Sequence, residues 1–449
     1  MSVSIGRYAP QEMGKPPREH IQIHNDPEGF VSRNHGDISF EKGRIFYTDH
    51  STNGTSISDA NGNVLREIKN EKVEIDPSWK IVLPNGSAIS FAVERLEMKV
   101  TEPPVKEEAR PNEQRQAYET TWERMKERAG ARSANSLVSF ISHSIDLREK
   151  QMGAGVRMGI DHNLNKIKSG RWDEGYVVHL PKEGQVIIIG DIHSKFDCLD
   201  HIMEETNFVE RVKNGEKLYL VFMGDLVDRP RVVGDGGGLK VFEAALSLLN
   251  SFPNNVIIEK GNHDGAAEGS LHPQEFYQEV RIKFGEKQAE FVLKKWREFY
   301  DKAPIAVKME NGGIAIHGGA SSTVKSLADL VKPSEETKFE IAWNDPNKNA
   351  KGYVDSSRGD GVYTYGEREH RNFVEATGSL MVFRGHEQDI RADFNGTCLT
   401  INSTDYKDAP KGYAIVDLSK DLKGYQVADL SDLISGKANI TPSIMIMTF

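Results

Sequence analysis

Three short apolar runs, each followed by a glycine and then by acidic or histidine residues, constrain the fold of this chain more than any other feature. The runs and their turns occupy residues 186–193, 218–229 and 256–264. A short β-branched run that stops at glycine is typical of a strand buried on both faces. Open α/β sheets place their polar chemistry at such strand ends. The three turns therefore predict an α/β domain with carboxylate, amide and imidazole groups along one edge.

These side chains suit a divalent metal of hard or borderline character. Asp191 and His193 are two residues apart, so in extended backbone they point to the same side and can share one ion. Neither cysteine is placed for a thiolate site, and manganese, iron or zinc suits the remaining donors. Two such ions stabilise the attacking and leaving oxygens of a phosphoryl displacement. The alternative is three ordinary polar turns, but their order and the histidines further along the chain favour a metal site.

The three turns have a specific resemblance when they are written out. They are Gly190-Asp191-Ile192-His193, Gly224-Asp225-Leu226-Val227-Asp228-Arg229 and Gly261-Asn262-His263-Asp264. They resemble the signature of metallophosphoesterases and, more narrowly, of the phosphoprotein phosphatase (PPP) family of serine/threonine phosphatases. Later segments are similar to the protein-phosphatase pattern, namely His317-Gly318-Gly319, Trp343-Asn344-Asp345-Pro346, residues 358–366, Arg384-Gly385-His386-Glu387 and Tyr406. The resemblance covers about residues 185–418.

The resemblance implies a role for each of these polar residues. The implied metal ligands are Asp191, His193, Asp225, Asn262, His317 and His386. His263 is the implied general acid with Asp228 as its partner, and Arg229, Arg358 and Tyr406 are the implied phosphate-binding residues. Two divalent ions, manganese first and iron or zinc as alternatives, would activate a hydroxide that attacks phosphorus.

Three positions depart from the family pattern. Ser194 and Pro230 replace glycines, and Asp264 replaces a glutamate. None of these changes removes an implied ligand. Ser194 and Pro230 restrict backbone freedom near the expected cleft, so they bear on substrate choice more than on catalysis.

Residues 1–99 have a different character, with short alternating strands separated by turn sequences. The expected strands are 37–40, 44–47, 80–83 and 88–93, with turns such as Pro84-Asn85-Gly86 between them. This spacing predicts an all-β sandwich. Residues 31–35 and 49–55 resemble the two recognition loops of the forkhead-associated (FHA) domain, which reads phosphothreonine peptides.

A phosphate group needs hydroxyl and guanidinium donors that converge on it. The resemblance assigns phosphopeptide binding to Ser32, Arg33, Thr52 and Asn53, and makes His35 a structural link between the loops. The family's additional arginine corresponds either to Arg7 or, as a lysine, to Lys15. The alternative is a sandwich whose Asn-Gly turns are only turns, or one that has kept the fold without binding.

The expected domains are an FHA-like sandwich over residues 1–99, a linker with connecting helices over 100–175, and a metallophosphatase over 176–435. Residues 101–114 are rich in proline and charge, which is typical of a linker. Apolar residues then recur at helical spacing. These helices either pack on the catalytic core or serve as a partner-binding segment or tether. The predicted fold is thus an all-β sandwich and an α/β metallophosphoesterase, itself a central β-sandwich flanked by helices, joined by a helical linker.

Composition narrows the partners and the compartment. A net charge of −10 argues against general binding to nucleic acid or an anionic membrane, since such binding depends on clustered cations. Two cysteines in 449 residues provide no disulfide framework and favour a reducing compartment, which we expect to be the cytoplasm. We recognise no secretory signal or membrane-spanning run.

The sequence therefore predicts a metal-dependent protein serine/threonine phosphatase that is directed to phosphothreonine-containing proteins by its FHA-like domain. A hydrolase of dinucleoside polyphosphates or a phosphodiesterase on the same metal core is one alternative. A phosphopeptide-binding scaffold with a non-catalytic phosphatase domain is another, although the complete ligand set argues against it.

Overall fold

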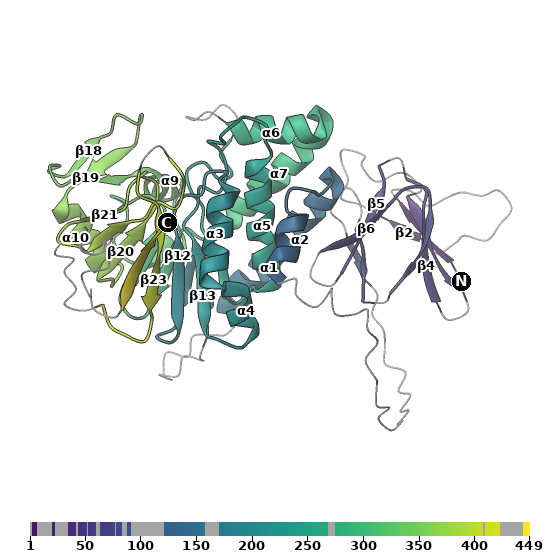
Figure 1. The fold of residues 1–449 in the computed structure, drawn as a ribbon, viewed down its shortest axis with the longest axis horizontal. Helices are drawn as coiled ribbons and strands as arrows, with labels where there is room; N and C mark the ends of the chain where they lie inside the picture. Colours follow the sequence, from purple (N-terminus) through teal and green to yellow (C-terminus); the bar gives the residue numbers. More distant parts are fainter. Residues whose placement is uncertain are drawn as a thin grey trace, which may run out of the picture. The chain divides into compact units, whose positions relative to one another are not determined.

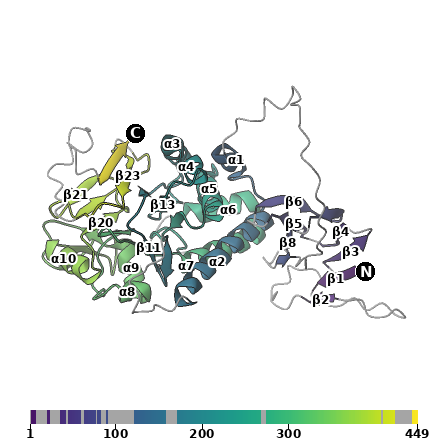
Figure 2. The same ribbon diagram turned by 90° about the horizontal axis from the view of Figure 1, so that it is seen from below.

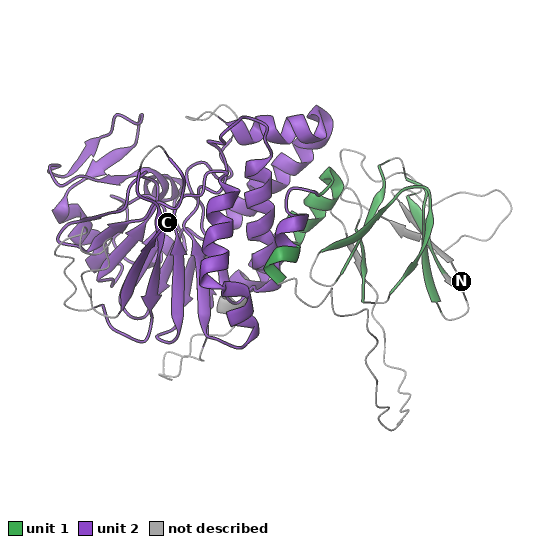
Figure 3. Ribbon diagram, in the orientation of Figure 1, with its two compact units in different colours: residues 1–124, 132–143 green, residues 125–131, 144–449 purple. Residues whose placement is uncertain are grey.

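The structure is a computed structural model of the 449-residue chain. It describes residues 2–6, 20–22, 35–41, 44–51, 53–59, 63–76, 78–82, 88–90, 121–157, 170–267, 274–406, 409–422 and 443–449. The chain divides into two compact units, which Figure 3 colours separately. Unit 1 is Met1–Arg124 with Arg132–His143, and unit 2 is Met125–Ala131 with Ser144–Phe449.

Unit 1 contains two β-sheets with a shared apolar core. One sheet has the order β2-β1-β3-β4-β7, with bounds β1 Ser2–Gly6, β2 His20–Gln22, β3 Gly36–Glu41, β4 Arg44–Asp49 and β7 Lys72–Ile75. The other has the order β6-β5-β8-β9, with bounds β5 Thr55–Ser58, β6 Val64–Ile68, β8 Lys80–Val82 and β9 Ala88–Ser90. Buried side chains from both sheets meet between them, including Ile38 and Tyr47 from the first and Ile57 and Ile81 from the second. The predicted all-β sandwich is confirmed.

A buried polar network joins the two expected recognition loops of unit 1. The ring of His35 lies 3.1 Å from the Thr55 hydroxyl, which donates to a carboxylate oxygen of Asp49 at 2.6 Å. The Tyr47 hydroxyl lies 3.0 Å from the same Thr55 oxygen. The backbone N–H of His50 donates to the His35 carbonyl at 2.8 Å. Because His35 and Thr55 are both buried, these bonds satisfy polar groups that would otherwise destabilise the sandwich.

Unit 2 is built on two larger sheets. The seven-stranded sheet has the order β10-β11-β15-β16-β20-β22-β21, with bounds β10 Trp172–Glu174, β11 Val177–Leu180, β15 Ala306–Met309, β16 Gly313–Ile316, β20 Met381–Arg384, β21 Arg391–Asp393 and β22 Cys398–Thr400. The five-stranded sheet has the order β14-β13-β12-β23-β24, with bounds β12 Gln185–Ile189, β13 Leu218–Phe222, β14 Val256–Ile258, β23 Gly412–Asp417 and β24 Ile444–Thr448. A small third sheet has the order β17-β19-β18, with bounds β17 Asp345–Pro346, β18 Tyr353–Asp355 and β19 Tyr363–Tyr365.

The two large sheets pack face to face, and helices cover their outer faces (Figures 1 and 2). Val186 and Ile188, which alternate along β12, enter the core between the sheets. Every residue from Val186 to Ile189 is fully buried, so both faces of this strand are covered. The helices are α1 Thr121–Arg128, α2 Ala134–Arg157, α3 Phe196–Thr206, α4 Phe208–Lys213, α5 Gly237–Ser251, α6 Glu275–Phe284, α7 Glu286–Lys302, α8 Ala328–Val331, α9 Glu335–Trp343 and α10 Glu367–Ala376. The predicted helix-flanked α/β sandwich is confirmed. Among the described residues, no helix is long and apolar enough to cross a membrane.

Candidate functional site

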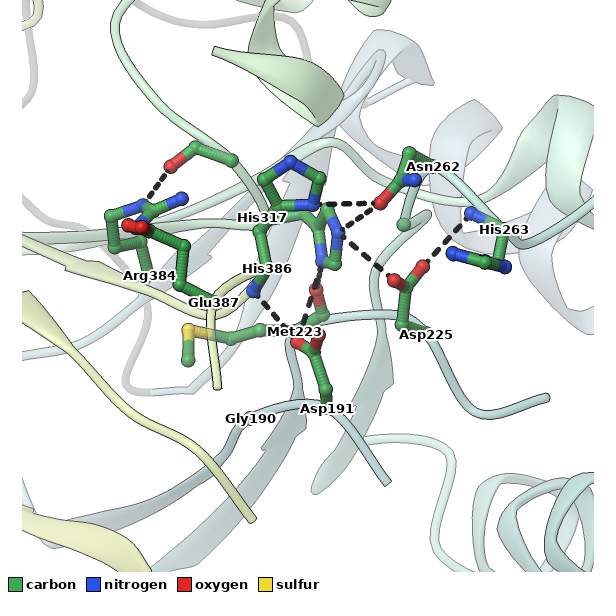
Figure 4. A network of polar contacts seen from close by, with 12 residues as sticks. Gly190, Asp191, Met223, Asp225, Asn262, His263, His317, Arg384, His386 and Glu387 are labelled. Atoms are coloured by element: carbon green, nitrogen blue, oxygen red, sulfur yellow. Dashed lines mark hydrogen bonds and ion pairs between the residues drawn. The ribbon is translucent and has the colours of Figure 1, made fainter. Parts of the chain in front are cut away.

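Five strands of unit 2 end at one cluster of polar side chains. In the five-stranded sheet β12, β13 and β14 are parallel neighbours, so their carboxyl ends lie at the same edge. In the other sheet β16 and β20 are also parallel. The turns that follow these five strands carry the predicted ligands and the predicted acid (Figure 4). The expected meeting of the strand ends therefore occurs, and it involves strands from both sheets.

The backbone of these turns is unusually strained. Left-handed φ angles occur at His193, Ser194, Asp225, Asp228, Arg229 and His386. Non-glycine residues seldom adopt this region, and such strain clusters at functional sites because the surrounding structure has to hold it in place. The turns also pack very closely: a Cβ on Gly261 would lie 2.2 Å from a carboxylate oxygen of Asp225. Only glycine allows this approach.

Two groups of ligand atoms share Asp225. His193, Asp225 and His263 form one group, and Asp225, His317 and His386 form the other; within each group the ligand atoms lie within 4.8 Å of one another. The same carboxylate oxygen of Asp225 is 3.6 Å from His193 Nε2 and 3.5 Å from His317 Nε2. This arrangement can hold two cations with Asp225 between them.

The other predicted ligands, Asp191 and Asn262, lie in the same network. Asp191 Oδ2 is 3.5 Å from His193 Nε2. Asn262 Oδ1 is 2.9 Å from His317 Nε2 and 2.8 Å from His386 Nδ1. All six predicted ligands are therefore brought together, although His263, predicted as the acid, also lies close enough to join a group.

The donor set fits a divalent cation. Asp191 Oδ2, His193 Nε2 and His386 Nε2 are buried and have no hydrogen-bond partner. Leaving such atoms unsatisfied is costly, and a bound cation would remove that cost for donors of this type. The second nitrogens of two histidines are already engaged: His193 Nδ1 lies 2.9 Å from the Val227 carbonyl and His317 Nδ1 lies 2.7 Å from the Met223 carbonyl. These contacts orient Nε2 toward the cluster, as the outer partners of metal-bound histidines do.

The carboxylates of the cluster favour positive charge on the groups beside them. Burial opposes ionisation of Asp225, yet the neighbouring His317 and His263 hold its pKa well below the usual range. Burial likewise lowers the pKa of His317, but Asp225 and Asp191 together raise it to about 9. Carboxylates that stabilise a positive imidazolium in this way also favour a metal cation.

The predicted acid and its partner form a buried pair. His263 Nδ1 lies 2.8 Å from Asp228 Oδ2, and the other oxygen of Asp228 accepts a hydrogen bond from the backbone of Phe276 at 2.8 Å. The other ring nitrogen, Nε2, lies 3.4 Å from Nη2 of Arg229. Because Asp228 holds one side of the ring, Nε2 faces the guanidinium that is predicted to bind phosphate.

Arg358 belongs to a second network that sequence analysis did not anticipate. Its Nε donates to Asp345 Oδ2 at 2.6 Å, and Asp345 Oδ1 accepts from the fully buried Arg384 at 2.7 Å. Arg384 also donates to Glu387 at 2.5 Å. Asp345 Oδ1 is 4.0 Å from His386 Nε2, so this network adjoins the metal ligands. The sequence signal for this network lies in the Trp343–Pro346 and Arg384–Glu387 motifs, where the resemblance assigns a role to His386 alone.

Asp264, one of the three departures from the family pattern, supports the backbone of the site. Its carboxylate accepts hydrogen bonds from the backbone N–H groups of Asp225 at 2.6 Å, Gly261 at 3.1 Å and Leu226 at 3.3 Å. Burial, followed by the charge of Asp225, raises the pKa of Asp264 to about 7. The shorter acid thus ties the turn after β13 to the turn after β14.

Tyr406 is partly buried, and the segment leading to it runs beside the first turn. The Ser403 hydroxyl accepts from the Gly190 N–H at 2.8 Å, and the Thr404 hydroxyl donates to the Ile192 carbonyl at 2.9 Å.

In unit 1, Asn53 is exposed, whereas Ser32, Arg33 and Thr52 lie outside the described residues, as do Arg7 and Lys15.

Comparisons with known proteins agree with both predicted folds. Residues 184–389 match the calcineurin-like phosphoesterase family and residues 3–92 match the FHA domain. The serine/threonine-protein phosphatase 6 catalytic subunit of Caenorhabditis elegans is 26% identical over 46% of this chain and 60% of its own length. A probable serine/threonine-protein phosphatase of Encephalitozoon cuniculi is 24% identical over 73% of this chain and 65% of its own length. The chain thus spans less than two thirds of either relative.

A solved structure shows the same fold. A protein serine/threonine phosphatase from Saccharomyces cerevisiae aligns with a TM-score of 0.52 and 20% identity, over 71% of this chain and 90% of that one. The matches to the two family models, the ligands at the strand ends and the sandwich architecture all indicate the same two kinds of domain. The chain therefore combines an FHA domain with a calcineurin-like phosphoesterase domain whose relatives are serine/threonine phosphatases of the PPP family.

Proposed function

We propose that this protein is a metal-dependent phosphatase of phosphoserine and phosphothreonine in proteins, directed to its substrates by its FHA domain. The observation that carries the proposal is the pair of ligand groups sharing Asp225, with the His263–Asp228 pair and Arg229 beside them. We propose Asp191, His193, Asp225, Asn262, His317 and His386 as the ligands of two divalent ions. Manganese is our first choice, since the donors are oxygen and imidazole.

The bound ions would supply a nucleophile and stabilise charge on the transferring phosphoryl group. The protein's own groups do the rest. Arg229 would bind phosphate oxygens as negative charge spreads over them. Arg358, held by Asp345, is partly exposed and would complete the phosphate site together with Tyr406.

His263 would give a proton from Nε2 to the leaving alkoxide. Asp228 holds Nδ1 of the ring at 2.8 Å, which fixes the ring orientation. Nε2 lies 3.4 Å from Nη2 of Arg229, which supports a proton donor next to the phosphate that Arg229 would bind. No covalent intermediate on the protein is required, because the bound ions would supply the nucleophile.

A cavity beside the metal ligands gives room for a protein substrate. It has a volume of about 510 Å³ and is lined by Asn262 and Asp264 on one side and by residues of α9, including Phe339 and Trp343, on the other. A cavity with apolar rings and charged residues can accept side chains that flank the phosphorylated residue. This supports a protein substrate over a small phosphate ester alone.

For the FHA domain we propose recognition of phosphothreonine-containing proteins through Ser32, Arg33, Thr52 and Asn53. The support is the family match over residues 3–92 and the His35–Thr55 link that holds the loop containing Asn53. We place the protein in the cytoplasm, since Cys198 and Cys398 are both free thiols. Binding at the FHA domain would raise the concentration of a second phosphosite near the metal site.

The metal requirement is the first test of this proposal. We expect the full chain to hydrolyse a small aryl phosphate and a phosphothreonine peptide only with a divalent ion, because the proposed nucleophile depends on the bound ions. Exhaustive chelation, verified by elemental analysis, should abolish both activities, and added manganese should restore them. Full activity in the metal-free protein would refute the proposed mechanism. Faster hydrolysis of a dinucleoside polyphosphate than of the peptide would favour the alternative substrate class.

The phosphopeptide site can be tested by removing two of its groups. Ser32→Ala combined with Asn53→Ala deletes a phosphate donor and a backbone clamp, each worth about 1–3 kcal/mol. Calorimetric titration of the metal-free full chain with a phosphothreonine peptide should show at least tenfold weaker binding. Ser78→Ala serves as the control. Ser78 lies in a turn of the same unit, and its hydroxyl donates to its neighbour Asp76. Unchanged affinity in the double variant would show that this surface does not read phosphate.

A further inference from the structure

Two side chains of the first turn hold the carbonyl groups of Asp228 and Arg229. The Ser194 hydroxyl donates to the Asp228 carbonyl at 3.0 Å. The Lys195 ammonium donates to the next carbonyl, that of Arg229, at 2.5 Å. Both residues are buried, with exposed fractions of 6% and 8%. Backbone hydrogen bonds from His193 to the Asp225 carbonyl and from Ser194 to the Leu226 carbonyl already join the turns after β12 and β13, and these two side chains extend the link to the Asp228 and Arg229 carbonyls.

The held carbonyls belong to two strained residues. Asp228 and Arg229 have φ angles of 62° and 50°, so two consecutive non-glycine residues lie in the left-handed region. Pro230 follows them and further limits the conformations of Arg229. Such a backbone persists only when its surroundings fix it. Ser194 and Lys195 provide that restraint from one side, and Glu275, which accepts from the Arg229 N–H at 3.4 Å, provides it from the other.

The positions of these two residues matter for the chemistry of the site, because Asp228 orients the proposed acid and Arg229 is the proposed phosphate-binding residue. We infer that Ser194 and Lys195 are positioning residues, a clamp that sets Arg229 for phosphate binding and Asp228 for orienting His263. This inference rests on the proposed function.

Charge makes Lys195 the stronger member of the clamp. An ammonium-to-carbonyl bond is charge-assisted, and it is shielded from water here. Arg231, Asp235 and Asp405 are the other charged groups that act on Lys195, and they oppose one another in sign.

The first experiment replaces Lys195 with methionine, which keeps the length and apolar stem of the side chain. We expect the KM for a small aryl phosphate and the Kd for inorganic phosphate, measured by calorimetry on the metal-loaded full chain, each to rise about tenfold. The kcat should fall less, and Lys195→Arg should recover most of the loss because it retains a cationic donor. Lys217→Met, which removes an exposed lysine paired with Glu183, is the control and should match the wild type.

A double-mutant cycle separates positioning from general stabilisation. If Lys195 acts through Arg229, then Lys195→Met should have little further effect on phosphate affinity in an Arg229→Ala background. Independent, additive losses would overturn the inference. So would an unchanged KM and phosphate Kd in Lys195→Met protein whose metal content and thermal midpoint equal those of the wild type.

Ser194→Ala tests the other carbonyl and keeps the inference falsifiable if Lys195→Met does not fold. Because Ser194 acts through Asp228 on His263, its loss should slow an alkyl phosphate more than an aryl phosphate, whose leaving group hardly needs a proton. Equal rates for variant and wild type on both esters would overturn this half of the clamp. A wild-type protein that binds inorganic phosphate but hydrolyses no ester would refute the proposed function, while the phosphate-affinity comparison would still test the clamp.

Discussion

Replacing His263 with alanine should lower kcat for an alkyl phosphate ester by about 10²–10⁴-fold, the usual contribution of a general acid. The reason is the orientation of the ring, whose Nδ1 is fixed by Asp228 at 2.8 Å while Nε2 faces Arg229. An alkoxide is a poor leaving group and needs that proton. An aryl oxide leaves without much assistance, so the loss for an aryl phosphate should be much smaller.

The measurement is kcat for both esters, together with the metal content of each protein. His201→Ala is a matched control, because His201 is a surface histidine of α3 paired with Glu205 at 3.4 Å. Metal content matters because His263 also lies within reach of His193 and Asp225. Loss of metal from the variant would identify His263 as a ligand. Equal losses on the two esters with full metal content would show that the ring is structural.

The apolar runs predict much of this fold because a continuous β-branched run that stops at glycine indicates a buried strand followed by a turn. The strand from Gln185 to Ile189 is buried on both faces, and its continuous β-branched pattern already indicates that. Parallel pairing then brings Asp191, Asp225 and Asn262 to one edge. The seven-stranded sheet also supplies ligands there, since His317 and His386 follow two of its parallel strands.

Other parts of the site depend on contacts between residues far apart in the chain. Asp345 joins Arg358 to Arg384, which lies 39 residues away from it, and neither local periodicity nor spacing reveals that pair. Ser194 appears in the sequence as a departure from a family glycine, but its bond to the Asp228 carbonyl requires the three-dimensional fold. The left-handed backbone at Asp228 and Arg229 is likewise invisible to propensity, because tertiary contacts impose it.

A buried ion network attaches the second half of α2 to unit 2, and it too was not foreseen. Arg148, from α2, donates to Asp173 and also to the carbonyls of Lys302 at 3.0 Å and Gly175 at 2.8 Å. Arg171 donates to both oxygens of Asp173, at 2.9 Å and 3.0 Å. Burial lowers the pKa of the Arg148 guanidinium to about 10. One carboxylate therefore compensates two buried cations.

Replacing Asp173 with asparagine should destabilise unit 2 by about 3–5 kcal/mol, because removing one partner of a buried ion pair leaves uncompensated charge in the interior. Although burial opposes ionisation of Asp173, Arg171 and Arg148 lower its pKa. Because its folded-state pKa is lowered, the carboxylate stabilises the folded protein at pH values above the ordinary aspartate pKa of about 3.9. That contribution disappears as the pH falls through the folded-state pKa. The difference between wild type and variant should therefore be full at neutral pH and shrink in acid.

Urea unfolding of the metal-free full chain, followed by tryptophan fluorescence, measures this difference, since Trp172 is next to Asp173 in β10. Asp421→Asn is the matched control: Asp421 pairs with Lys182 at 2.6 Å, but about half of its side chain is exposed. Such a pair contributes about 0–1 kcal/mol. A loss of that small size in Asp173→Asn as well would mean that water or the neighbouring carbonyls already compensate the two arginines. A large loss that did not diminish in acid would point to packing rather than to charge as its cause.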